Sequence, residues 1–260
     1  MRTMILLLAS AWLGGALGAQ PPPPPPPHFG DVTFNGSTTL GSQYIFRGLT
    51  QTDGKPTVQA ELDLVHPAGF YASLALSNIS WITDQFSAGP ASACVEVDLF
   101  GGYKWGFAKD WTLDVGLYRY LYPGNYNTLA NYHPDTTEGY LGISYKWLSF
   151  KYSRVLSEEN FGIADARCSS YLDLNLGIPL SDSGWTVLLH GGKTTFSSGH
   201  TGNRDSLNYT DYKVGVMKER KSYTLALSAT HADTKDQGYN NAMGRNIGKG
   251  RMTLTIAKSF

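Results

Sequence analysis

The sequence has little charge, little cysteine and few long apolar segments. Charged residues make up 16% of its 260 positions, and 21 Lys plus Arg balance 21 Asp plus Glu. Because the formal charges cancel, no overall field attracts nucleic acid or an acidic partner, and we expect neither. After the N-terminal segment no apolar run approaches the roughly 20 residues of a membrane helix. The 3.6-residue period of amphipathic helices is almost absent as well, so the fold is expected to be all-β.

The N-terminal segment reads as an export signal. Residues 4–17 are apolar, follow an arginine and lead into small residues, so we expect a secretory signal peptide over residues 1–19. Residues 20–30 contain seven consecutive prolines, which favour a stiff, extended periplasmic leader that offers no amide donors to a sheet. The folded part of the exported chain is expected to span residues 31–260.

The rest of the chain alternates between apolar and polar residues, as strands with two different faces do. The clearest example is residues 58–65, "VQAELDLV", where every second residue is aliphatic and two of the others are carboxylates. Twelve such segments are expected, at 31–47, 56–66, 69–79, 94–105, 111–122, 137–147, 148–156, 170–180, 185–195, 209–218, 222–231 and 250–260. Alternation alone fits both a soluble sandwich and a membrane barrel.

The connections between these segments favour the barrel. They alternate along the chain between six long loops and five short turns, so one kind falls at each end of the fold. Outer-membrane barrels have this asymmetry, with short periplasmic turns, longer external loops and an even number of strands. We therefore predict a transmembrane antiparallel β-barrel of about 12 strands in the cell outer membrane of a Gram-negative bacterium, with membrane lipid around it.

The last strand and the aromatic residues agree with this placement. The segment "RMTLTIAKSF" carries Met252, Leu254 and Ile256 on one parity and ends in Phe260, like the strands that the barrel-assembly machinery recognises, although Lys258 interrupts the apolar row. Tryptophans cluster beside the short turns, and tyrosines near the long loops. Two aromatic girdles are expected at the two interfaces of a membrane.

Several stretches resemble a known family. They are "SQYIFRGLTQTDGKPTVQAELDLVHPAGFYASLALSN", "VEVDLFGGYKW", "LDVGLYRYLYPG", "EGYLGISYKWLSFKYS" and "SSYLDLNLGIPL". Together they resemble the TorF family of proposed porins of Gram-negative outer membranes, over residues 38–260. The most specific part is Tyr44-Ile45-Phe46-Arg47-Gly48 with Gln51 and Pro56, because barrel patterning alone would not dictate it. The resemblance implies an outer-membrane location and a pore; it brings no catalytic residues.

Charged residues of both signs fall on the parity that faces the lumen. The residues expected to line the pore are Arg47, Glu61, Asp63, Glu96, Asp98, Lys104, Asp114, Glu138, Lys146, Lys151, Asp173, Asp211, Lys213 and Arg251. Opposed charges can sort small hydrophilic solutes or ions that diffuse passively through a channel. They can equally close into ion pairs that fill a structural or adhesive barrel, because twelve strands lie between filled and open barrels in size.

Arg47 stands out because it precedes Gly48 at the outer rim. Three roles fit it: contact with an anionic solute, holding a loop folded inward, or a rim salt bridge with Glu61 on the neighbouring strand.

The two cysteines, Cys94 and Cys168, are candidates for a disulfide in an exported protein. Each lies where a long loop returns to a strand, and four strand spacings separate them, so a bond requires the loops to fold over the mouth as a lid. The alternative is two free thiols.

Enzymatic activity is not expected. The sequence has neither a G-x-S-x-G nor an H-E-x-x-H motif, and its six histidines are scattered. An outer-membrane hydrolase with a loop-borne site is the less favoured alternative, since histidines also occur in or beside external loops. The glycine-rich "GGYKWG" lies on a strand and is no phosphate loop, so no nucleotide, metal or other cofactor is expected.

Overall fold

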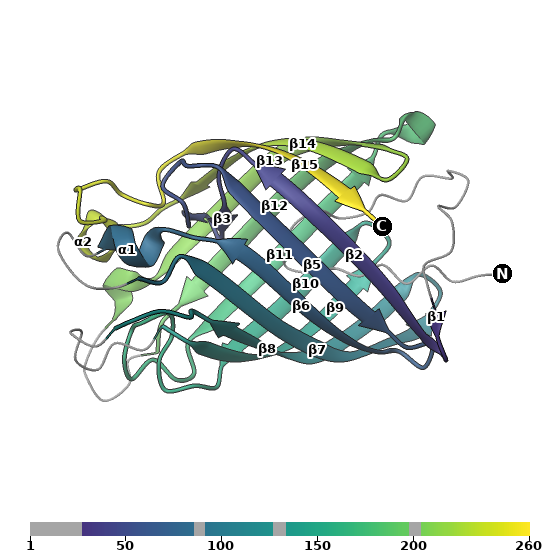
Figure 1. Ribbon diagram of the computed structural model, residues 1–260, viewed down its shortest axis with the longest axis horizontal. Coiled ribbons are helices and arrows are strands. Elements are labelled where there is room, and N and C mark those ends of the chain that lie inside the picture. The colour runs from purple at the N-terminus through teal and green to yellow at the C-terminus, as the bar shows by residue number, and fades with distance from the viewer. Residues whose placement is uncertain (1–27, 86–91, 127–133, 198–203) are drawn as a thin grey trace.

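The computed structural model describes residues 28–85, 92–126, 134–197 and 204–260. The signal peptide expected at 1–19 and most of the leader expected at 20–30 lie outside the described residues. What remains is one barrel of antiparallel strands, with little helix in the described residues (Figure 1).

Twelve strands of the described chain form the closed wall, as predicted. They are β2 (Val32–Gly41), β5 (Thr57–Val65), β6 (Phe70–Asn78), β7 (Val95–Ala108), β8 (Trp111–Leu121), β9 (Thr136–Tyr145), β10 (Leu148–Val155), β11 (Ser170–Pro179), β12 (Trp185–Thr195), β13 (Tyr209–Arg220), β14 (Tyr223–Ala232) and β15 (Arg251–Ser259). From β5 to β15 each strand pairs with the next along the chain. The wall closes because β2 pairs with both β5 and β15.

The short elements sit in the connections, and Figure 1 shows the long loops at one end of the barrel and the short turns at the other. They are β1 (His28–Phe29), β3 (Ile45–Phe46), β4 (Leu49–Thr50), α1 (Trp81–Gln85), η1 (Ser181–Ser183), η2 (Asp205–Leu207) and α2 (Asp236–Tyr239). At the short-turn end, Asp110, Lys146 and Lys221 have positive φ angles, as tight hairpin turns require. Within the described residues, no helix has the length and apolar character to cross a membrane.

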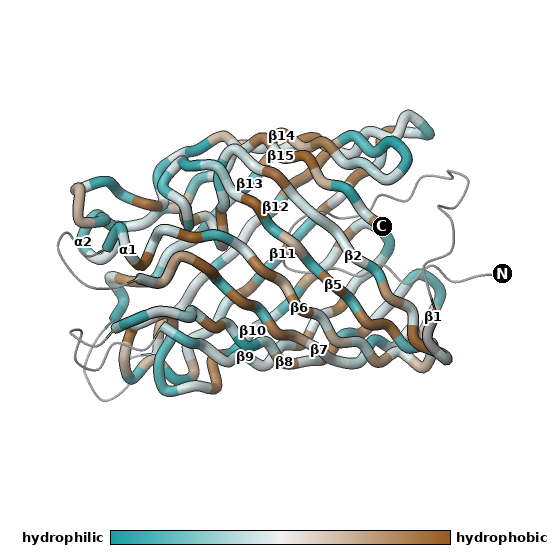
Figure 2. Tube along the Cα trace, viewed as in Figure 1, coloured by the Kyte–Doolittle hydropathy of each residue, from teal (hydrophilic) through white to brown (hydrophobic). Residues whose placement is uncertain are grey.

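The outer face of the wall is apolar and the inner face is polar. Figure 2 shows hydrophobic and hydrophilic residues alternating along the strands. Along β6, for example, exposed and buried residues alternate without error, and the exposed ones include Leu74 and Leu76. Exposed aliphatic residues continue around the wall, including Leu99, Leu141, Leu172, Val214, Leu225 and Ile256. In water so large an apolar surface would be unfavourable, whereas lipid matches it.

The seam between β15 and β2 is short and extended by the last residue. Five residue pairs join these strands, against nine between β2 and β5. Phe260 then exchanges two backbone hydrogen bonds of 3.0 Å with Gly36. A Cβ at Gly36 would lie 2.3 Å from the Phe260 ring, so the ring rests directly on the glycine and would have to turn away from a larger residue.

The first strand is shorter than predicted. The sequence predicts a strand over 31–47, but β2 ends at Gly41. The chain then leaves the wall at Ser42, whose amide donates to Leu254 O at 2.8 Å, and enters a separate hairpin. The apolar pattern at 44–46 belongs to that hairpin instead of to the wall.

Candidate functional site

The hairpin formed by residues 43–56, here called the lumen hairpin, folds into the outer end of the barrel. It contains β3 and β4, which pair through Ile45 with Thr50 and Phe46 with Leu49. Arg47 (φ 46°) and Gly48 (φ 78°) form its tip. A two-residue hairpin turn needs positive φ at both positions, which Gly48 meets without strain.

Arg47 anchors the tip to the wall. Its Nη1 and Nη2 donate to Glu138 Oε1 and Oε2 on β9 at 2.9 and 2.6 Å. The guanidinium also lies 4.8 Å from the ring centre of Phe46 and 4.3 Å from that of Tyr171 on β11. Burial works to lower the pKa of Arg47, but the charge and hydrogen bonds of Glu138, together with Tyr120 and Tyr171, outweigh it and raise this pKa well above its usual value. The pair is therefore a charged, bidentate bridge.

Gly48 fits against the far wall of the lumen. A Cβ at this position would lie 2.4 Å from Asp211 Cβ on β13 and 3.0 Å from Ala232 Cβ on β14. Because the hairpin leaves from β2, contacts with β9, β11, β13 and β14 mean that it crosses the mouth of the barrel. Two loops hold its return strand: the Thr50 amide donates to Ile247 O at 3.0 Å, and Gln51 O accepts from the Ser80 amide at 2.8 Å.

Tyr44 fastens the base of the hairpin to β7. Its hydroxyl donates to Glu96 Oε1 at 2.7 Å, and the Tyr122 hydroxyl donates to Glu96 Oε2 at 2.7 Å. Burial and the charges of Glu96 and Asp98 raise the pKa of both phenols well above the usual value. Both phenols therefore keep their protons and remain donors to the carboxylate.

The two halves of the lumen differ in bulk. Large inward aromatic side chains gather on β6–β9, where Phe100 stacks on Tyr118 at 4.6 Å and Tyr118 on Tyr120 at 4.4 Å. The inner faces of β14 and β15 carry only small residues: Thr224, Ala226, Ser228, Thr230, Ala232, Thr253, Thr255 and Ala257, next to Arg251. The inner faces of β14 and β15 are therefore less bulky than those of β6–β9.

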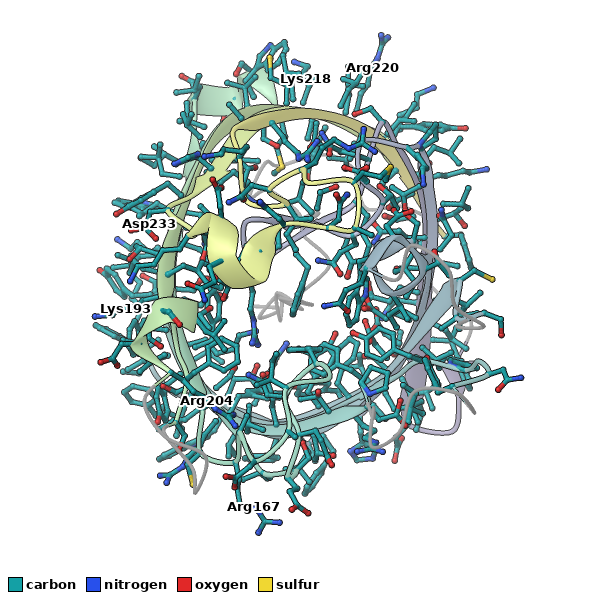
Figure 3. All side chains as sticks on the ribbon, turned by 90° about the vertical axis from the view of Figure 1, so that its left-hand side faces the viewer. Arg167, Lys193, Arg204, Lys218, Arg220 and Asp233 are labelled. Atoms are coloured by element: carbon teal, nitrogen blue, oxygen red, sulfur yellow. The ribbon has the colours of Figure 1, made fainter. Side chains whose placement is uncertain are left out.

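Most of the charged residues predicted for the pore lie on the inner face. Inward strand positions hold Glu61, Asp63, Glu96, Asp98, Lys104, Asp114, Glu138, Lys151, Asp173, Asp211, Lys213 and Arg251, since they alternate with the exposed apolar positions. Figure 3, viewed from the long-loop end, shows side chains on both faces of the ring, with Arg167, Lys193 and Arg220 on its outer side. That the inward residues line a conducting path stays a prediction.

Two of the predicted positions need correction. Arg47 is not on a wall strand, and it pairs with Glu138 instead of Glu61, because the hairpin carries it across the lumen. Lys146 was expected to face the lumen, but it is exposed in the turn between β9 and β10 with φ 51°. Its Nζ lies 5.1 Å from the ring centre of the neighbouring Tyr145, on the outward parity.

The predicted disulfide is absent, since both thiols are free and exposed. Cys94 precedes β7 and Cys168 precedes β11, so four spacings of about 4.8 Å separate their strands, far beyond the reach of a bond. The Cys168 side chain instead hydrogen bonds with Arg154, which is exposed on the outward parity of β10. A segment does fold over the mouth, but it is the lumen hairpin.

The barrel also contains a buried histidine cluster that was not predicted from the sequence. His190 Nε2 lies 2.8 Å from Asp211 Oδ1, while its Nδ1 lies 3.1 Å from Asp173 Oδ1 and 2.7 Å from Asn175 Oδ1. The inward parity of β12 would have indicated this meeting. The cluster joins β11, β12 and β13 beneath the tip of the hairpin, since Tyr171 also donates to Asp211 at 3.1 Å. Among the described residues, no group of three or more His, Cys, Asp and Glu is arranged to hold a metal ion.

The fold is similar to solved outer-membrane barrels. The NanC porin aligns with a TM-score of 0.51 at 14% identity, over 86% of this chain and 98% of that one. A chain solved in work on the in-meso crystallisation of membrane proteins aligns at 0.50 with 9% identity, over 87% and 83%. The toluene transporter TodX of P. putida reaches 0.48 with 10% identity, over 89% and 90%. At 14% and 9% identity, the first two alignments show a shared fold alone.

Comparison of the sequence with known protein families identifies one match. No curated protein matches this chain. One protein family does, and its match starts at the first described strand and extends over the whole barrel. The chain belongs to the family described as "Bacterial protein of unknown function (Gcw_chp)", which matches residues 28–260.

Proposed function

We propose that this chain is a porin-like channel of a Gram-negative outer membrane, through which small hydrophilic solutes or ions diffuse passively. The observation that carries the proposal is the lumen hairpin: it narrows the mouth of a barrel with an apolar outer face, and it is bound by the Arg47–Glu138 bridge. A segment that constricts a charged lumen can sort solutes by size and charge.

We infer that the passage follows the small inward residues of β14 and β15 below the hairpin, whose tip lies against Ala232 at the outer end of β14. Charges of both signs face it, with Arg251 and Arg245 near Asp53 at 3.5 and 2.5 Å on the hairpin side. The same proposal includes three further points. Residues 1–19 are a signal peptide, the assembly machinery recognises the strand ending in Phe260, and the chain is one of the TorF porins. No catalytic role is assigned.

Conductance in a planar lipid bilayer tests this function. The refolded mature chain should give small, persistent current steps in potassium chloride, and charge reversal at Asp211 should shift the ratio of cation to anion permeability. A control porin refolded in parallel shows that the bilayer is competent. Absence of steps beside a conducting control would contradict the channel.

One other function is favoured by a specific observation. The aromatic cluster on β6–β9 lies on the inner face of the wall, and the docked hairpin crosses the mouth of the barrel. A barrel plugged in this way would act through its external loops as a structural or adhesive protein. It would remain silent in the bilayer even when the hairpin is released by substitution at Glu138, whereas a gated channel would then conduct.

A further inference from the structure

The inner face of β7 holds a carboxylate that its surroundings do not satisfy. Asp98 is only 7% exposed, and its Oδ1 is buried without a hydrogen-bond partner in the described part of the chain. The charged groups that act on it are all carboxylates: Glu96, Glu61 and Glu138. An isolated buried carboxylate is unfavourable, and added negative charge increases the cost.

The neighbouring carboxylates already have partners of their own. Glu138 is bound by Arg47, and Glu96 accepts from two tyrosines. Asp63 accepts a hydrogen bond from the Glu61 carboxyl group and another from Ser73 at 2.5 Å. Asp98 Oδ1 and Glu61 Oε1 are therefore carboxylate oxygens left over on this wall, because Glu61 Oε1 is also buried without a partner in the described residues.

The strand register brings these two acceptors together. Glu61 on β5 pairs with Ala75 on β6, which in turn pairs with Asp98 on β7. Their Cα atoms are thus two strand spacings, about 10 Å, apart. Ala75 is the inward residue between them, and its methyl group offers no hydrogen bond to either carboxylate.

Aromatic faces border the same place. Asp98 pairs with Tyr120 on β8, and Phe100 lies two residues further along the inner face of β7. Their rings belong to the stack Phe100–Tyr118–Tyr120. Aromatic faces attract organic cations, and N–H donors on such a cation would satisfy the carboxylate oxygens.

We propose that Asp98 and Glu61 form a binding site in the lumen for an organic cation that carries an ammonium group and a short apolar body. The ammonium donates to Asp98 Oδ1 and Glu61 Oε1 over Ala75, and the apolar body lies against Tyr120 and Phe100. The site deepens the proposed function and rests on it only for access, because it names the solute class that the channel would select.

Binding of n-butylammonium to the refolded barrel tests the site. Ligand-observed NMR in detergent should show saturable binding to the wild type, and Asp98→Asn should weaken it by roughly tenfold or more, as loss of a charge-assisted hydrogen bond predicts. Asp173→Asn is the matched control, since that carboxylate faces the other side of the lumen and is bound by His190 and Asn175. Butyrate, of similar size and opposite charge, should not bind.

Stability offers a second readout that a merely structural carboxylate would not give. Asp98→Asn removes an uncompensated charge, so it should raise the unfolding temperature, and n-butylammonium should raise that of the wild type but not of the variant. Phe100→Leu should weaken binding of n-butylammonium, with Phe70→Leu on the outer face as its control.

The outcomes separate the site from the channel. Binding that Asp98→Asn leaves unchanged, or equal competition by sodium at the same concentration, overturns the organic-cation site even if the barrel conducts. A barrel that binds n-butylammonium through Asp98 but never conducts keeps the site and refutes the channel. In a conducting barrel, n-butylammonium should interrupt the current in the wild type and much less in Asp98→Asn.

Discussion

Replacing Glu138 by Gln should release the lumen hairpin. The side chains of Arg47 and Glu138 are 11% and 3% exposed, so little solvent screens their bridge. Removing one partner of a buried ion pair costs about 3–5 kcal/mol, because the other charge stays buried without compensation. Gln keeps one acceptor for Arg47, which favours the lower end. At tenfold per 1.4 kcal/mol, the undocked fraction should rise by roughly a hundredfold or more.

Trypsin measures that fraction directly, because Arg47 is itself a cleavage site at the tip of the hairpin. In liposomes, cleavage after Arg47 should accelerate in Glu138→Gln in proportion to the undocked population, as long as the hairpin opens and closes faster than the protease cuts. The current through a conducting barrel should become larger and noisier. Glu158→Gln is the control, since that carboxylate is exposed in the loop between β10 and β11.

A double substitution checks the electrostatic part of the reasoning. Arg47→Met combined with Glu138→Leu removes both charges and keeps apolar volume, which is often neutral for a buried pair. The hairpin should then stay docked, with quiet current. Unchanged cleavage and current in Glu138→Gln would refute the claim that this bridge holds the hairpin. Fast cleavage and noisy current in the double variant would show that the two side chains hold the hairpin by more than the balance of their charges.

Three further predictions follow from single positions. Gly48→Ala should also expose the hairpin to trypsin, because a Cβ would lie 2.4 Å from Asp211 Cβ at a φ of 78°. Cys94 and Cys168 should both be alkylated without reductant, and peptide mapping of the native protein should find no linked pair. Leu141→Arg, on the exposed outer face of β9, should lower the unfolding free energy in lipid by about 2–4 kcal/mol in a denaturant titration.

The wall could be predicted because its signals are local. A strand shows its two faces within a few residues, and each connection shows its own length, so the twelve strands and the sorting of loops follow from neighbouring letters. A local signal can still be wrong when a wall strand and a hairpin strand have the same pattern. The alternation at 44–46 predicts a continued wall strand, yet these residues form β3 of the hairpin. Lys146 likewise sits on the correct parity but at the turn, where parity no longer determines direction.

The site escaped prediction because its contacts join distant parts of the chain. Arg47 and Glu138 lie 91 positions apart, and no pattern in the sequence around either residue indicates that the other is its partner. The motif at 44–48 nevertheless indicates a special role. A wall strand requires only alternating polarity, and this does not explain these particular residues. Tyr44 reaches Glu96, Phe46 packs edge-on against Tyr120 at 5.7 Å, and Gly48 fits against Asp211.

Tyr44, Phe46, Arg47 and Gly48 each meet a different strand of the wall, so each of these four identities depends on a distant neighbour. With so many separate contacts, undocking the whole hairpin costs much free energy, but a substitution at any one contact should weaken its docking. The inward residues of β14 and β15 are small, whereas aromatic side chains gather on β6–β9. In the proposed channel, a solute would therefore meet the charged wall around Asp98 on one side and the small inward residues of β14 and β15 on the other.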